Sequence, residues 1–565
     1  MSKFRCLVCC FFITVIGVSQ FSGAIANAYG KSHNDFNFQE SFIDLNGNWH
    51  RWAGWIQFEI SDPPELGRTR KGLRKIRLDY SKGPLTFQLG DIYTIWSRGL
   101  MVNMVDDQSI DLDTGIRGGL VNWSNNIFEI EFLSGSQNIW RLTNQVRDFD
   151  NRIPNYGVEY SLYGGRISGH YQGLTSAVQF MKVVEDHPNA RDIIEKVHHQ
   201  LMGANLEYFG DNSDFGLEWA IKDSIGFGLF GNVNFYGWGW SIGGSYKNYH
   251  FADLAPDRRW DIVNYTGGVL TLQQMPTVFK EHATRLLSRI THIIDYNDEV
   301  GFEIRLEGPV DEHAQLTLFY TQSSRHQEWA GDEVWQWNTR GKSMRMPSSK
   351  AELNPFREFY AELDGDFMNG NFHYTLGGGL TDDVIDIYRN QYIGSGQFLV
   401  YEAITAQTFP THISYVFNQS FSFDVKYEYQ ELQKGIHRYT GTIPGRFISF
   451  ESIFLKETQI NRFMSFGVNR SPKWSVNLAI DMSSTEERII MESERDVNSI
   501  EKILGKFWDT SLTWASMELA YNISENHRLT VMVGSQRGGV LCSNGVCRYI
   551  QPFENGFKVG LVSLF

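Results

Sequence analysis

The sequence lacks a hydrophobic stretch long enough for a membrane-spanning helix. Such a helix needs about 20 consecutive apolar residues, and no segment after residue 18 approaches that length. This absence argues against a bundle of membrane helices. It leaves open a membrane protein that crosses the bilayer with β-strands, since a spanning strand needs only about 9–11 residues.

Basic charge and proline are also scarce. The chain has 51 Lys and Arg against 65 Asp and Glu, and its formal net charge is −14 at pH 7, which argues against nucleic acid as a partner. Pro numbers only 14, whereas Gly numbers 53 and aromatic residues make up 14% of the chain. Strands rich in Gly and aromatic residues are typical of membrane barrels with aromatic girdles. No fixed repeat period is present, which argues against a soluble β-solenoid or propeller.

The N-terminus has the three parts of a secretory signal peptide. Lys3 and Arg5 precede an apolar run over residues 6–18, and small residues follow up to Ala28. An N-terminal membrane anchor is the alternative, but the run is short for crossing a bilayer. We predict cleavage after Ala28, which divides the chain into a signal peptide (1–28) and one exported barrel domain (29–565).

Cysteine is scarce outside this N-terminal segment. Of five cysteines, three fall within the first ten residues, so only Cys542 and Cys547 remain in the exported chain. They flank an Asn544-Gly545 turn, which can bring the two Cβ atoms to disulfide distance. A redox-active pair is the alternative, but it lacks the C-x-x-C spacing. We expect one disulfide, as fits an oxidising compartment, and no metal or cofactor.

Apolar and polar residues alternate along many segments. In residues 55–60, Phe58 and its apolar neighbours share one face, and Glu59 lies on the other. Residues 74–80 and 127–133 repeat the scheme, often with full charges on the polar face. In a soluble sandwich that polar face would meet water; in a membrane barrel it lines the lumen, while the apolar face meets lipid.

The connections between these strands alternate in length. Short connections rich in Gly, Asn, Asp and Ser fall at 81–83, 124–126, 164–165, 211–213, 369–370, 418–420, 471–472 and 524–526. Long polar connections fall at about 91–116, 134–155, 173–199, 324–354 and 483–505. Short periplasmic turns and long external loops are typical of bacterial outer-membrane barrels.

The fold prediction follows from this alternation. We predict an all-β protein, a large antiparallel transmembrane β-barrel of about 22–24 strands in the bacterial outer membrane. Counting back from a periplasmic C-terminus places connection 536–556 outside the cell. The pattern blurs only between residues 223 and 298, where a Gly-rich stretch has no clear break.

The chain ends in a strand with apolar residues on one face. Phe557, Val559, Leu561 and the terminal Phe565 occupy alternate positions, interrupted by Ser563. This ending looks like the assembly signal that the barrel-insertion machinery reads. The expected partners are therefore that machinery and the lipid of the outer membrane.

The least strand-like stretch near the N-terminus covers residues 89–119. Its charged residues are Asp91, Arg98, Asp106, Asp107, Asp111 and Asp113. One interpretation is a loop folded into the lumen, where these charges constrict the pore and set its selectivity. A Ca²⁺ site is a second, although no EF-hand spacing is present. A solvated external loop is the third.

This block also carries a resemblance. Leu89, Gly90, Asp91, Tyr93, Gly99 and Leu100 match a pattern in which a strand ends in Leu-Gly-Asp-Phe-Tyr and runs on to Gly-x-Gly-Leu. The chain resembles an uncharacterised porin-like outer-membrane β-barrel family of Gram-negative bacteria, and residues 538–561 resemble the same family's ending. Ile92, Ser97 and Gln551 depart from the pattern. The resemblance implies an exported barrel and no particular activity.

The sequence shows no arrangement of His or Ser residues that is typical of a known catalytic motif. His198-His199 and the pair His282 and His292 lack the zinc-protease spacing, and no Ser-His arrangement marks a triad. We therefore expect no enzyme.

The first hypothesis for the function is a porin-like channel that passes a small solute or an exported polymer. A structural, assembly or surface-binding protein is the alternative, and a membrane hydrolase is the third hypothesis. A separate N-terminal plug domain is lacking, which argues against a plugged receptor.

Overall fold

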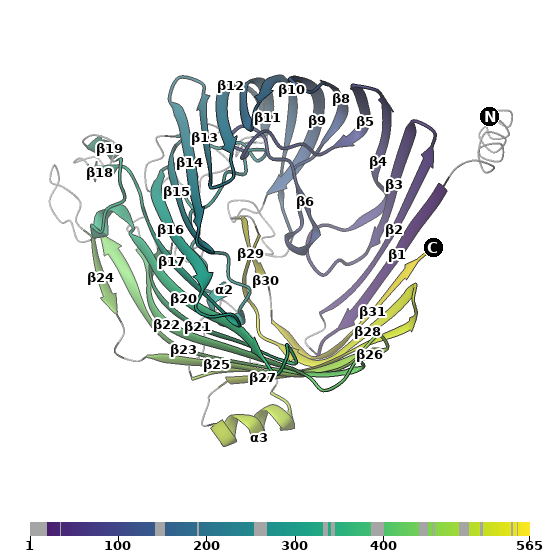
Figure 1. The fold of residues 1–565 in the computed structure, drawn as a ribbon, viewed down its shortest axis with the longest axis vertical. Coiled ribbons are helices and arrows are strands. Elements are labelled where there is room, and N and C mark those ends of the chain that lie inside the picture. Colours follow the sequence, from purple (N-terminus) through teal and green to yellow (C-terminus); the bar gives the residue numbers. More distant parts are fainter. Residues whose placement is uncertain are drawn as a thin grey trace.

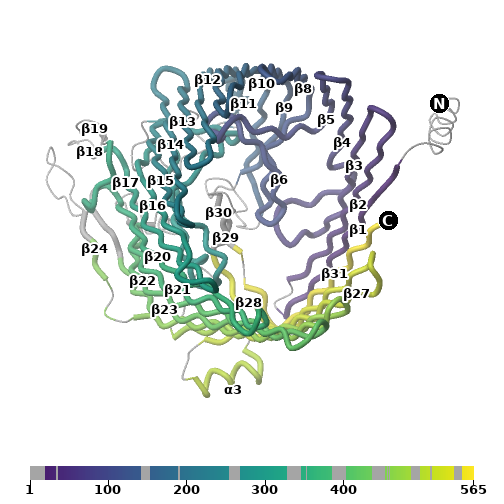
Figure 2. The backbone as a smooth tube through the Cα atoms, in the orientation of Figure 1, coloured from purple at the N-terminus to yellow at the C-terminus, as the bar shows by residue number. Residues whose placement is uncertain are grey.

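The computed structural model describes residues 20–565 except 34–35, 142–152, 189–190, 192, 253–267, 332–336, 341–344, 386–399, 440–449, 455, 457, 485–496, 509–511, 544–545 and 551. Twenty-four antiparallel strands close into one barrel (Figures 1 and 2). The predicted fold class and strand number are therefore confirmed. Among the described residues, no helix has the length and apolarity needed to cross a bilayer.

The barrel wall follows the order of the chain. Its strands are β1 (Gln20–Lys31), β2 (Asn37–Trp49), β3 (Trp52–Ser61), β4 (Arg70–Lys82), β5 (Leu85–Ile92), β8 (Ile116–Ser124), β9 (Phe128–Arg141), β10 (Tyr156–Tyr171), β11 (Leu174–Pro188), β12 (Ile194–Phe209), β13 (Ser213–Lys222), β14 (Gly226–Gly237), β15 (Trp240–His250), β16 (Glu299–Pro309), β17 (Ala314–Ser324), β20 (Phe356–Phe367), β21 (Phe372–Ile385), β22 (Val400–Val416), β23 (Phe421–Tyr439), β25 (Gln459–Arg470), β26 (Trp474–Ser483), β27 (Leu512–Ser524), β28 (His527–Gln536) and β31 (Phe553–Leu564). Each strand pairs with its neighbours, and β1 pairs with β31 to close the ring.

Smaller elements lie in the connections. They are the strands β6 (Asp106–Asp107), β7 (Leu112–Asp113), β18 (Glu328–Gly331), β19 (Trp337–Arg340), β24 (Phe450–Phe454), β29 (Gly539–Ser543) and β30 (Val546–Ile550), with α2 (Arg285–Ser288), α3 (Ser499–Trp508) and the 3₁₀ turns η1 (Gln108–Ile110) and η2 (Ala351–Leu353). Helix α3 lies outside the ring of strands (Figure 1).

The strands turn their apolar faces outward. In β3, Phe58 and Ile60 are exposed, at 38% and 50%, while Glu59 between them is 7% exposed. In β9, Phe128 and Phe132 are likewise about half exposed. A soluble protein would bury these faces, so the arrangement matches a wall that meets lipid outside and polar groups inside. The protein is an outer-membrane β-barrel.

Most of the predicted short and long connections fall between strands, and two do not. Residues 164–165 lie inside β10, where a Cβ at Gly164 would be 2.6 Å from the Phe180 carbonyl oxygen of β11. These glycines therefore allow close strand approach, and they form no turn. Residues 173–199 contain the whole of β11 and the start of β12, and both faces of β11 carry apolar residues. Such a strand lacks the alternation that would have revealed it.

The blurred region between residues 223 and 298 resolves into two strands and one long connection. Strands β14 and β15 are joined by a tight turn at Trp238-Gly239, both with positive φ. The chain then leaves the wall at residue 251 and returns with β16 at Glu299. The part of this connection that the structure describes, residues 268–298, lies within the ring of strands.

The barrel seam includes residues that we predicted to be cleaved off. Strand β1 pairs with β31 from Ala24 opposite Leu564 to Lys31 opposite Phe557. At the end of the seam, the Gly23 N–H donates to the Phe565 carbonyl (2.8 Å), and the Phe565 N–H donates to the Gly23 carbonyl (3.0 Å). Cleavage after Ala28 would remove nine of the twelve residues of β1. That cleavage position therefore does not fit the observed seam.

The connection before the last strand, which we expect to start on the external side, carries a hairpin that folds into the barrel. Strands β29 and β30 lie within the ring of strands (Figure 2), and a Cβ at Gly539 would lie 3.5 Å from Arg289 Cγ in α2's C-cap. The ladder sets Cys542 opposite Cys547. Their side chains lie outside the described residues, so the disulfide stays a prediction.

The first testable prediction concerns the N-terminus of the exported chain. A closed barrel leaves no strand edge unpaired in lipid, so we expect β1 to be retained. Gly17-Val18-Ser19 offers a small-x-small pattern immediately before β1. We propose that cleavage occurs there. Mass spectrometry of the protein extracted from outer membranes should find a chain that begins at or before Gln20. A mature chain beginning at Tyr29 would contradict the proposal.

The second prediction concerns Phe565. Removing it deletes both seam hydrogen bonds to Gly23 and the ring that covers this glycine. We propose that the insertion machinery reads this strand. Deletion should then lower the amount of heat-modifiable barrel in outer membranes without lowering export. Phe417→Ala is the control, because this aromatic is 66% exposed next to a short turn at the same end of the barrel. Equal levels of the two variants would refute the role of Phe565.

Candidate functional site

The connection from β5 to β8 folds into the barrel. We call residues 93–115 the first inner loop; it contains β6, η1 and β7 and lies inside the ring of strands (Figure 2). Trp96, Leu100, Met101 and Val102 are fully buried. Of the three interpretations of residues 89–119, the structure therefore agrees with a loop folded into the lumen.

A second connection meets the first. We call residues 268–298 the second inner loop, and the two inner loops together the plug. The Asn103 N–H donates to the Leu272 carbonyl (2.8 Å), and the Gln273 side-chain amide donates to the Leu100 carbonyl (2.8 Å). These two hydrogen bonds join segments that are far apart in the sequence, so they hold the two loops together as one unit.

The plug shares an apolar core with one side of the wall. Trp96, Leu100 and Met275 pack with inward side chains of neighbouring strands. Those wall residues include Val158, Tyr160, Leu162, Met181, Val183, Leu201, Ala220 and Phe230. Full burial of one such side chain contributes about 1.5–3 kcal/mol, so this core holds the plug firmly against β10–β14.

Asp91, at the end of β5, forms an ion pair with Arg117. The Arg117 guanidinium of β8 contacts both of its carboxylate oxygens, at 3.2 and 3.0 Å. The Ile76 N–H of β4 also donates to Asp91 (2.6 Å). The carboxylate thus joins three adjacent strands at the point where the first inner loop begins.

Asp106 and Asp113 bind two cations of β4. Arg74 contacts Asp106 at 2.9 Å, and Lys75 contacts both Asp106 (3.5 Å) and Asp113. Asp113 also accepts a hydrogen bond from the Tyr93 hydroxyl (2.9 Å). Lys75 is only 2% exposed, so these pairs are shielded from water and hold the tip of the loop to the wall.

Asp107 and Asp111 shape the loop locally. The Asp107 carboxylate accepts hydrogen bonds from the N–H and hydroxyl of Ser109, at 3.0 and 2.6 Å, at the start of η1. Asp111 ends η1 with φ of 47°, a left-handed conformation that aspartate tolerates better than most residues. The predicted group of six charges therefore divides into wall anchors and turn-forming residues.

Arg98 completes the group on the opposite flank of the loop. Its guanidinium contacts Glu207 of β12 at 3.1 Å, and its N–H donates to Glu218 of β13 (2.8 Å). Nearby, the Trp96 indole N–H donates to Glu131 of β9 (2.5 Å). Inward carboxylates of three strands thus hold the buried part of the first inner loop.

The second inner loop is anchored by carboxylates that the sequence analysis did not identify. Glu428 of β23 accepts the N–H groups of Arg285 and Leu286, at 2.8 and 2.7 Å. These are the first N–H groups of α2, which lack partners within the helix. The carboxylate therefore holds the helix start to the wall.

Asp481 of β26 is the second anchor. Arg289, which follows α2, contacts both of its carboxylate oxygens, at 3.1 and 2.5 Å. Arg537, at the start of the β28–β31 connection, contacts it at 3.3 Å. One buried carboxylate thus joins the second inner loop, the wall and the connection that carries the β29–β30 hairpin.

Both histidines of the second inner loop meet carboxylates. His282 lies 2.9 Å from Glu358 of β20. His292 Nδ1 lies 3.0 Å from Asp383 of β21, and His292 Nε2 lies 3.4 Å from Glu299. Burial alone would lower the pKa of His292, but Asp383 and Glu299 outweigh it and raise the pKa to about 9. His292 is therefore a cation at neutral pH.

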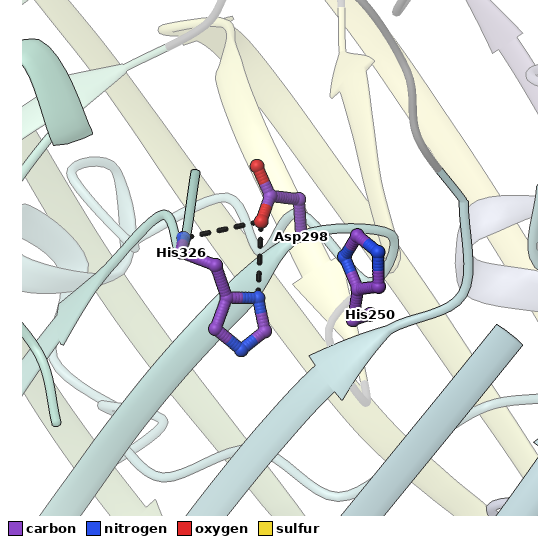
Figure 3. A group of neighbouring side chains, drawn as sticks. All are labelled: His250, Asp298 and His326. Carbon is purple, nitrogen blue, oxygen red and sulfur yellow. Dashed lines mark hydrogen bonds and ion pairs between the residues drawn. The ribbon is translucent and has the colours of Figure 1, made fainter. Parts of the chain in front are cut away.

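A cluster of metal-ligating side chains lies beside the plug. His250, Asp298 and His326 each offer one ligand atom, and these atoms lie within 4.8 Å of one another. In Figure 3, Asp298 lies between the two imidazole rings. The sequence analysis named none of the three, since they are 28 or more residues apart and follow no metal motif. Only the ends of adjacent strands bring them together.

Several solved structures match this chain over most of its length, at TM-scores below 0.5. The "Copper transporter OprC" matches with a TM-score of 0.43 and 10% identity over 97% of this chain and 81% of that one. The siderophore receptor PirA from Pseudomonas aeruginosa matches with a TM-score of 0.45 and 7% identity, over 97% and 80% of the two chains. The FrpB iron transporter from Neisseria meningitidis matches with a TM-score of 0.41 and 8% identity, over 96% and 82%.

Sequence comparison identifies a family. No curated protein sequence matches this chain. A family model described as a family of unknown function (DUF6029) matches residues 25–565, which is nearly the whole chain. This match agrees with the resemblance of residues 89–100 and of the C-terminal strand to an outer-membrane barrel family without a known activity. The chain belongs to the DUF6029 family.

Proposed function

We propose that the protein is an outer-membrane channel for small solutes, in which the plug sets the width of the lumen. The observation that supports this proposal is the two-sided attachment of the plug. An apolar core fixes it to β10–β14, and the buried carboxylates Glu428 and Asp481 fix it to the far wall. A barrel of this strand number has a wide interior unless chain fills it.

The attachment to the far wall also has an apolar part. Leu287 of α2 and Ile290 pack with Tyr360, Ile404 and Leu432 of the wall. Ion pairs fix orientation more sharply than apolar contacts, because each carboxylate accepts donors from defined directions. The carboxylates therefore determine where α2 sits across the lumen, and the apolar contacts add stability.

The runner-up function is a structural or surface-binding barrel without transport. A lumen filled by folded loops supports this alternative as well, since a plug that never moves would block passage. The two functions differ in ion conductance. A channel conducts ions when it is reconstituted in a planar lipid bilayer, and a sealed scaffold does not.

The third prediction tests the plug. Asp481→Asn removes the charge that faces Arg289 and Arg537, and loss of one partner of a buried ion pair typically costs about 3–5 kcal/mol. The second inner loop should loosen, and single-channel recordings should show a higher or more fluctuating conductance than the wild-type protein. Comparing gel mobility before and after heating checks that the barrel of the variant forms.

Arg357→Gln is the matched control. Arg357 pairs with Asp382 at 3.0 Å, and both side chains are about half exposed. Its conductance should equal that of the wild type. Absence of conductance in the wild type and in Asp481→Asn would favour the structural function and contradict the channel.

The fourth prediction concerns pH. The pKa of His292 is raised from 6.5 to about 9 in the folded protein, so its stabilising charge is fully present below about pH 6.5 and is lost as the pH rises through 9. Subtilisin should therefore cut the second inner loop faster at pH 9.5 than at pH 7. His292→Gln should be cut quickly at both.

The exposed histidine His313 provides the control for this pH effect. It lies in a short connection, its side chain is 66% exposed, and its Nδ1 lies 3.7 Å from Asp366. His313→Gln should keep the wild-type dependence on pH. A cleavage rate that does not change between pH 7 and 9.5 in the wild type would refute the role of His292.

A further inference from the structure

The strongest cluster outside the plug anchors is the group of His250, Asp298 and His326 at the rim of the barrel. We propose that these three residues bind a divalent transition metal ion. The binding itself does not depend on the channel function. Its consequence for the plug, argued below, rests on the proposed function.

Three consecutive strands bring the ligands together. His250 is the last residue of β15, Asp298 directly precedes β16, and His326 follows the end of β17 by two residues. Tyr249 pairs with Glu299, and Val300 pairs with Ser324, so the three strand ends are adjacent at one rim. The wall therefore fixes the ligand backbones before any ion binds.

The donor set selects the class of ion. Two imidazoles and one carboxylate suit Zn²⁺ and similar first-row ions, whereas Mg²⁺ and Ca²⁺ prefer oxygen ligands alone. Zinc binds nitrogen and oxygen ligands at about 2.0–2.2 Å, so ligand atoms within 4.8 Å need only a modest inward shift. Three protein ligands leave a fourth position open, which is typical of sites that exchange ligands.

Neighbouring amides orient both rings. His326 Nε2 lies 2.9 Å from the Asn248 Oδ1 atom, and the Gln327 side-chain amide lies 3.3 Å from His250 Nε2. An oxygen acceptor such as Asn248 Oδ1 fixes the orientation of a metal-bound ring, and the Gln327 amide nitrogen makes a donor contact to the His250 ring. With Nε2 of His326 held by Asn248, its Nδ1 faces Asp298 at 3.0 Å, and an ion could bind between these two atoms.

Two of the three ligands are buried, and the third is partly exposed. His326 and Asp298 are 1% and 2% exposed, so their interaction with a cation is little weakened by water. His250 is only partly buried. An ion can therefore approach from the side of His250 and meet the two buried ligands behind it.

The position of Asp298 would let a bound metal ion attach the second inner loop to the wall. This residue ends the second inner loop, while His250 ends β15 on one side and His326 lies just beyond β17 on the other. A bound ion would join the end of the loop to both neighbours. In the proposed channel, metal binding would therefore hold the plug closed, and removal of the ion would loosen it.

The experiment is a calorimetric titration of the purified full-length barrel with Zn²⁺ in detergent. The wild type should bind one Zn²⁺ per chain. Asp298→Asn keeps the shape of the side chain and removes its charge, and His326→Gln removes a ligand; each should weaken binding at least tenfold. Gel mobility before and after heating checks that each variant forms the barrel.

The control is His373→Gln. His373 is an exposed histidine beside Asp364 (3.3 Å), and its ring lies 6.4 Å from that of His412, so it tests adventitious binding to a surface histidine. Unchanged binding in this control with weakened binding in the two site variants supports the proposal. Absence of Zn²⁺ binding in the wild type, undiminished binding in both site variants, or loss of binding in the control overturns it. None of these outcomes depends on whether the barrel conducts.

Discussion

Pairing between inward carboxylates of the wall and donors of the two inner loops is the interaction on which the interior depends. Glu131, Glu218, Glu428 and Asp481 come from four separate strands, yet each accepts a hydrogen bond from a loop. A buried carboxylate without a partner would be costly. The wall and the plug therefore require each other: the strands need cations and N–H groups inside, and the loops need fixed acceptors.

The membrane imposes the complementary constraint on the outside. Lipid offers no hydrogen bonds, so every strand must pair on both edges. The seam between β1 and β31 meets this requirement down to Gly23 and Phe565. The same constraint turns apolar side chains such as Phe58 outward and leaves the polar positions for the interior. Closure of the wall thus creates the inward carboxylates that the plug then satisfies.

Sequence patterns predicted the wall well because the two-residue period reports which face of a strand meets lipid. They failed at β11, where Val178 faces outward and Met181 packs inward against the plug core, so both faces are apolar. The predicted boundary at Ala28 falls within β1, because a signal peptide and a Gly- and Ala-rich strand share small residues. Composition near Ala28 alone does not separate the two, and the pairing of β1 with β31 favours retention of the strand.

The role of the charged residues in 89–119 could be predicted only in part from the sequence, for a different reason. The cluster around Asp106 and Asp113 was visible in the sequence, but its partners Arg74 and Lys75 lie more than 30 residues earlier, on a strand whose alternation looked ordinary. Pairing changes the role of these residues. An aspartate held by a buried cation contributes little field to the lumen, so it fixes the position of the loop more than it selects ions. In the proposed channel, charge selectivity would then depend on which lumen charges the plug leaves uncompensated.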